Sequence, residues 1–111
     1  MRRSDLGEFE EIVLLAVAAL SGNAYTIAIA EELERETGNM ITSGAVHAAM
    51  QRLEQKGYLR SEWGEATAER GGRRKRLYTV TALGGRILEE SRAVRNRFWD
   101  RILPSVRLEW N

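Results

Sequence analysis

The chain has 111 residues, a formal net charge of +1 and no cysteine. This length fits one domain with its own hydrophobic core, and the lack of cysteine excludes disulfide bonds and thiolate metal sites. It is also compatible with a reducing cytoplasm, where we expect the protein to act. Arg2 and Arg3 precede an apolar run at 12–20, as in a signal peptide. The nearby acids Asp5, Glu8, Glu10 and Glu11 and the shortness of the run argue against a signal or a membrane span.

Two helices are predicted first. Apolar residues repeat at helical spacing from Leu6 to Leu20, which predicts a helix over about residues 5–21. Thr26 is placed to cap a second helix, and Gly38 with Asn39 is suited to end it.

A third helix is predicted from Thr42 or Ser43 to the pair Lys56 and Gly57. One face carries the apolar residues Val46, Ala49, Met50 and Leu53, and the opposite face is small and polar. A helix enters the major groove of DNA most easily when its N-terminal turns carry short polar groups. Capping explains the first two residues as well, and solvent exposure explains Gln51. The candidate DNA-reading residues of this helix are Thr42, Ser43, Gly44, His47, Gln51 and Arg52.

Two strands follow, at about 58–63 and 76–80, with Tyr78 and Val80 predicted to point inward. The segment between them is polar, contains Gly71 and Gly72, and is too long for a tight turn. Such a basic loop is often simply solvated, but its place between two strands after a helix-turn-helix pattern favours a wing that contacts DNA phosphates or a minor groove. The candidate wing contacts are Arg70, Arg73, Arg74, Lys75 and Arg76.

The last predicted helix begins after Thr81 and stops at Pro104. It has more apolar surface than one short domain needs. Folding back onto the chain's own core would cover this surface, but we favour pairing with a second copy, as in a homodimer. Aromatic residues beside such a seam are candidates for binding a small aromatic or apolar effector. The predicted dimerisation residues are Ile87, Val94, Phe98, Trp99 and Ile102.

No catalytic or cofactor site is predicted. His47 is the only histidine, so metal binding has no histidine pair to rest on. Gly71 and Gly72 lie between strands rather than between a strand and a helix, which does not fit a phosphate-binding or dinucleotide loop. The paired acids fall on helix surfaces, where solvation is the simpler interpretation. We therefore predict a protein that is not an enzyme and uses no cofactor.

A set of short segments is distinctive when taken together: 6–10, Ala24 with Tyr25, 44–46, 52–57, 63–65, 69–73, Tyr78 and Thr81. These segments resemble the PadR family of bacterial transcriptional regulators. The likeness covers about residues 5–90, and its wing segment is the most specific part. It implies a winged helix-turn-helix dimer, usually a repressor, that binds a palindromic operator and can be released by a small ligand. It also adds Tyr25 to the candidate DNA contacts.

The chain departs from the family pattern in three places. Tyrosine is common in the family where this chain has His47, and a proline is often found near Thr67 and Ala68. The C-terminal region is short, which places the chain with the small members that have one C-terminal helix.

The predicted fold is α+β, mainly α. We expect a winged helix-turn-helix DNA-binding domain at 1–81 and a C-terminal dimerisation helix and tail at 82–111. The expected function is sequence-specific binding of double-stranded DNA. The alternative is a winged-helix module in which the same surfaces bind a protein; a strong salt dependence of nucleic-acid binding separates the two.

Overall fold

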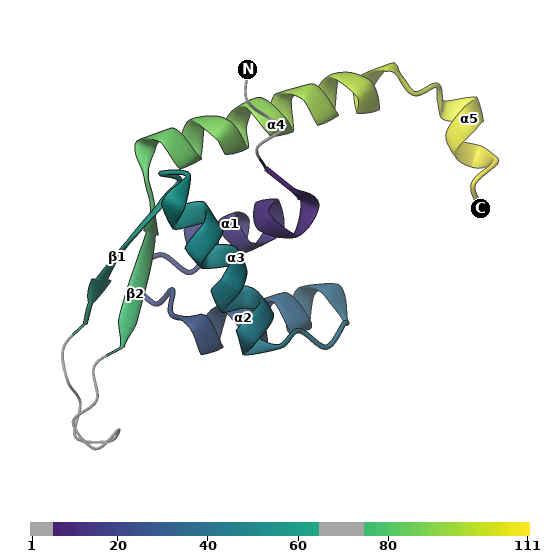
Figure 1. The fold of residues 1–111 in the computed structure, drawn as a ribbon. Coiled ribbons are helices and arrows are strands. Elements are labelled where there is room, and N and C mark those ends of the chain that lie inside the picture. Colours follow the sequence, from purple (N-terminus) through teal and green to yellow (C-terminus); the bar gives the residue numbers. More distant parts are fainter. Residues whose placement is uncertain (1–5, 65–74) are drawn as a thin grey trace.

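The computed structural model describes residues 6–64 and 75–111, and within them five helices and two strands (Figure 1). Their order is α1 (Glu8–Ala19), α2 (Thr26–Thr37), α3 (Ser43–Gln55), β1 (Leu59–Trp63), β2 (Arg76–Val80), α4 (Ala82–Arg101) and α5 (Pro104–Leu108). This arrangement confirms the predicted α+β, mainly α, class.

The core lies where α1, α2 and α3 pack against one another and against the strands. Leu14, Ile29 and Met50 from the three helices are fully buried. The whole predicted apolar face of α3 is buried as well. Burying each large side chain stabilises the fold by about 1.5–3 kcal/mol. The packing therefore leaves only the opposite face of α3 open to a partner.

The helix boundaries follow local capping chemistry. The Thr42 hydroxyl accepts a hydrogen bond from the Ala45 amide at 3.1 Å, so Thr42, rather than Ser43, caps α3. Gly38 ends α2 in the left-handed conformation, with a φ of 75°. α1 begins at Glu8, later than the predicted position 5, because Gly7 is its N-cap residue.

The two strands form an antiparallel pair, in a register that sets Leu59 opposite Val80 and Trp63 opposite Arg76. Tyr78 is buried as predicted, whereas Val80 is only half-buried. The Tyr78 amide donates to the carbonyl of Ala24 at 2.9 Å, which ties the sheet to the connection between α1 and α2. The sheet is therefore fixed to the helical core at the base of the predicted wing.

The C-terminal region differs from its prediction. α4 ends at Arg101, and Ile102 is already extended, with a ψ of 121°. Pro104 begins the short helix α5 as well as stopping α4, because the first residue of a helix needs no amide donor. The C-terminal region therefore holds the predicted long helix and, within the predicted tail, a short second helix that was not predicted.

α5 lies beside the end of α4. The rings of Trp99 and Trp110 meet edge to face at 6.3 Å, and the Arg107 guanidinium lies 5.3 Å from the Trp99 ring centre. The C-terminal half of α4, together with α5, extends away from the body of the molecule (Figure 1). The whole molecule, including this extension, measures 58 × 32 × 20 Å. None of the helices in the described ranges is both long and apolar enough to cross a membrane.

Candidate nucleic-acid interface

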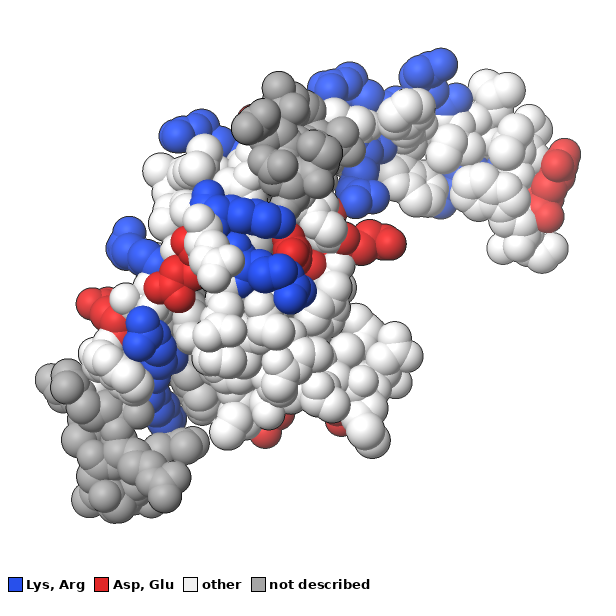
Figure 2. Space-filling view, in the orientation of Figure 1, with Lys and Arg blue, Asp and Glu red and all other residues white. Residues whose placement is uncertain are grey.

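The face of α3 opposite the core is exposed at its N-terminal end. Thr42, Ser43, Gly44, His47 and Gln51 all lie on the surface, as predicted for reading residues. None of them carries a formal charge when His47 is neutral. In Figure 2 the surface around this end of α3 is uncharged, and Lys and Arg gather near its C-terminal end and along the strands. Small uncharged groups here let the helix backbone approach base edges closely.

Arg52 forms an ion pair with Glu10, a contact that was not predicted from the sequence. Its Nε donates to Glu10 Oε2 at 2.8 Å, and Lys56 Nζ donates to Glu10 Oε1 at 2.6 Å. Glu10 is buried on α1, while the Arg52 side chain is 51% exposed. Arg52 therefore lies beside this exposed face of α3, with one of its nitrogens already hydrogen-bonded within the protein.

The pKa of Glu10 reflects this contact. Burial alone would raise it, but the hydrogen bonds from Lys56 and Arg52 outweigh burial, and the pKa lies below the ordinary glutamate value. Glu10 is therefore ionised at neutral pH and fixes two cations beside α3.

Lys75 and Arg76, which form the described end of the predicted wing and are called the wing stem below, each face an aromatic ring. Lys75 Nζ lies 4.1 Å from the ring centre of Tyr25, and the Arg76 guanidinium lies 5.1 Å from that of Trp63. These cation–π contacts orient the cations without neutralising them. Tyr25, predicted as a DNA contact, thus lies at the wing stem. Arg70, Arg73 and Arg74 lie outside the described residues.

Two successive hydrogen bonds connect the wing stem to α3. The Ser61 hydroxyl accepts from Arg76 Nε at 2.9 Å and donates to Glu54 Oε2 at 2.7 Å. Glu54, Ser61 and Trp63 were not among the predicted site residues. Strand alternation gives a signal for Ser61 and Trp63, because residues two apart on one strand share a face.

The predicted dimerisation stripe divides into two parts. Ile87 is 4% exposed and belongs to the chain's own core, so the structure corrects its assignment to a dimer seam. Phe98 and Trp99 are 63% and 52% exposed, and Val94 and Ile102 are half-buried. Trp110 is exposed as well, and three further exposed apolar residues of this region were not predicted: Leu103, Val106 and Leu108.

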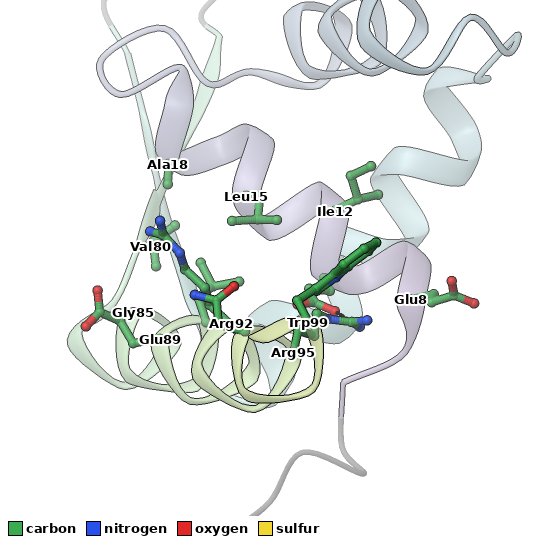
Figure 3. A pocket seen from close by; sticks show the side chains of 13 residues that line it. Glu8, Ile12, Leu15, Ala18, Val80, Gly85, Glu89, Arg92, Arg95 and Trp99 are labelled. Carbon is green, nitrogen blue, oxygen red and sulfur yellow. Dashed lines mark hydrogen bonds and ion pairs between the residues drawn. The ribbon is translucent and has the colours of Figure 1, made fainter. Parts of the chain in front are cut away.

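A groove of about 760 Å³ lies between α1 and α4. Its apolar lining includes Ile12 and Leu15 from α1 and Leu88 and Trp99 from α4. Figure 3 shows Trp99 projecting from α4 toward α1 on the side of Ile12. Charged groups border the groove, among them Glu11 and Arg95. This open, mostly apolar space is suited to a flat apolar molecule or to apolar side chains of another chain.

The chain is similar to known proteins both in sequence and in fold. Residues 14–90 match the family described as "Transcriptional regulator PadR-like family". An uncharacterized protein from Lysinibacillus sphaericus is 33% identical over 94 residues, which make up 81% of this chain and 82% of that protein.

Solved structures show the same fold. A PadR family transcriptional regulator from Eggerthella lenta is 30% identical, with a TM-score of 0.62 over 79% of this chain and 74% of that one. A PadR family transcription regulator from Clostridium difficile is 25% identical, with a TM-score of 0.64 over 83% and 92%. A PadR-like transcription factor from Bacteroides fragilis is 23% identical and matches in fold, with a TM-score of 0.70 over 90% and 88%.

Proposed function

Because the chain belongs to the PadR-like family of transcriptional regulators, we propose that it is a repressor that binds a palindromic operator as a homodimer. Members of this family are transcriptional regulators that bind DNA, not enzymes. The observation that supports the reading role most directly is the exposed, uncharged N-terminal face of α3 between flanking cations. By this proposal the protein acts in the cytoplasm, where the DNA is.

In the proposed complex the N-terminal turns of α3 enter the major groove. Ser43 and Gln51 are the side chains on this face best able to hydrogen-bond base edges. The wing, with Arg76 at its stem and Arg70, Arg73 and Arg74 beyond, contacts the phosphate backbone or the minor groove beside it. The reading domain is 1–81 by this proposal.

Residues 82–111 pair two copies. The exposed Phe98 and Trp99 on α4 and Ile12 and Leu15 on α1 supply an apolar surface for this contact. Two reading heads related by a twofold axis bind half-sites about one helical turn apart, roughly 34 Å. A small aromatic or apolar effector held in the groove between α1 and α4 would release the repressor by changing this spacing.

The experiment is selection of bound sites from a random duplex pool, followed by binding of reading-face variants. Because Thr42 caps α3, Ser43→Ala removes a hydroxyl from the reading face without removing the cap. We expect Ser43→Ala or Gln51→Ala to weaken binding to the selected site by about 1–3 kcal/mol, and binding to random DNA by much less.

Gln55→Ala is the matched control. Gln55 is an exposed glutamine on the same helix, one turn further from the N-terminus that enters the groove. Equal losses on selected and random DNA for all three variants would refute sequence reading by this face. Binding that is insensitive to salt would refute a DNA-binding role for the surface.

A further inference from the structure

Two consecutive acids on α1 contact two different helices. Glu10 accepts from Arg52 and Lys56 on α3, at 2.8 and 2.6 Å. Glu11 accepts from Ser91 Oγ at 2.7 Å and from Arg95 Nη2 at 2.8 Å, both on α4. Neighbouring residues of a helix point about 100° apart, so adjacent acids are well placed to reach different partners.

In these contacts the two carboxylate side chains are more buried than in ordinary surface ion pairs. The side chains of Glu10 and Glu11 are only 11% and 14% exposed. Ser91 is 4% exposed, and a buried hydroxyl needs a hydrogen-bond partner, which Glu11 supplies. The positions of the two acids are therefore coupled to those of α3 and α4.

The first turn of α4 is fixed separately. The Thr81 hydroxyl donates to the Gly57 carbonyl at 2.6 Å, and the Thr81 amide donates to the Tyr58 carbonyl at 3.0 Å. A Cβ on Gly84 would lie 2.3 Å from the Tyr58 carbonyl oxygen, so the two backbones are in close contact there. We call this junction the pivot of α4; from it α4 runs past Glu11 and on to its exposed end.

The geometry converts movement of the exposed end into movement at Glu11. At 1.5 Å per residue, Ser91 lies about 10 Å and Arg101 about 26 Å from Gly84 along a rigid helix. A displacement of about 2 Å at Arg101 then becomes about 0.8 Å at Ser91. That is enough to stretch the 2.7 Å bond between Ser91 and Glu11 to the limit of hydrogen bonding.

We propose that Glu10 and Glu11 are positioning residues of the DNA-reading surface, which together form a strut that sets the position of α3 according to that of α4. α3 packs chiefly against α1, α2 and β1, whereas α4 packs against α1 and β2, so α1 is the element that both contact. An occupant of the groove, or pairing through the end of α4, moves α4 about its pivot. The strut carries that movement to the cations on the flank of α3.

This inference rests on the proposed function, because it takes α3 as the reading helix. The strut itself is tested in DNA-free, full-length protein by amide hydrogen exchange. The double variant Ser91→Ala/Arg95→Gln cuts the strut on the α4 side and changes no residue of α3. We expect it to speed exchange of the Lys56 amide, which donates to the Arg52 carbonyl at 3.0 Å, by about threefold or more.

Arg92→Gln is the matched control for charge. It removes one cation from the same helix and the same groove, and in the described part of the chain Arg92 has no ion pair to lose. Arg95→Lys, which keeps the charge facing Glu11, should restore slow exchange when Ser91 is intact. On DNA, the strut variant should lose selectivity for the selected site about threefold or more, whereas Arg92→Gln weakens selected and random binding equally.

The route through Glu10 is tested by repeating the α4 change in a Glu10→Gln background, where it should have no further effect on α3. If Glu10→Gln does not fold, Arg52→Met/Lys56→Met cuts the same link from the other side. Unchanged exchange in α3, or an undiminished effect with Glu10 removed, would overturn the strut. Failure of the Ser43 and Gln51 variants to change selectivity would count against the proposed reading face, which the exchange measurement does not use.

Discussion

Gly84→Ala is expected to destabilise the protein because α4 starts in close contact with Tyr58, the residue just before β1. An alanine Cβ at this position would lie 2.3 Å from the Tyr58 carbonyl oxygen and 3.0 Å from Val80 Cγ1. Ordinary carbon–oxygen contacts are about 3.3 Å or longer. The backbone of α4 must therefore move by roughly 1 Å, and the contact is with backbone, which cannot rotate away.

The magnitude follows from two opposing effects. Overpacking that forces such backbone shifts costs about 1–3 kcal/mol. Alanine regains up to about 1 kcal/mol over glycine inside a helix. For Gly85→Ala only the second effect applies, since no atom lies within 4 Å of a Cβ there. We expect the free energy of unfolding to differ between the two variants by the overpacking cost alone, about 1–3 kcal/mol, with Gly85→Ala at or above wild type.

Urea unfolding followed by circular dichroism measures this difference directly. The two substitutions are chemically identical and adjacent on one helix, so helix propensity cancels between them. Equal stabilities for Gly84→Ala and Gly85→Ala would refute the close contact between α4 and Tyr58. They would also remove the pivot on which the strut depends.

Two further predictions follow from the ion pairs and from the exposed end of α4. Glu10→Gln should lower the free energy of unfolding by about 1–3 kcal/mol at pH 7, less than for a fully buried pair because the partners are partly exposed. Since the pKa of Glu10 is lowered on folding, this stabilisation is complete above the ordinary glutamate pKa of about 4.3 and is lost as the pH falls through the lower folded value. Urea unfolding from pH 7 downward should therefore show the gap between wild type and variant closing in acid, and a constant gap would contradict it. In a sedimentation experiment, Phe98→Gln should shift the dimer toward monomer. The control Met40→Gln, which changes an 87% exposed side chain elsewhere, should leave the dimer unchanged. Equal sedimentation of the two variants would exclude Phe98 from the dimer seam.

The sequence predicted what depends on local chemistry and periodicity. The core face of α3, a cap at Thr42 or Ser43, the Gly38 stop and the bounds of β2 all follow from residues near one another in the chain. Partners distant in sequence could not be paired in this way. Glu10 lies 42 residues before Arg52, and nothing in the spacing of either residue indicates the other. Arg52 was thus predicted as a DNA contact without the acid that holds it.

The stripe on α4 shows the limit of periodicity in one helix. Gly84, Ile87 and Ser91 are its buried residues, and the same spacing continues through Val94 to Phe98, where the side chain is exposed. Periodicity reports that a face avoids water, but not which surface covers it. The division falls where α4 passes beyond the body of the molecule (Figure 1). Glu11 contacts Ser91 close to this division. By the proposal above, a movement of the exposed end of α4, which we assign to the dimer contact, would therefore be transmitted to α1 through Glu11.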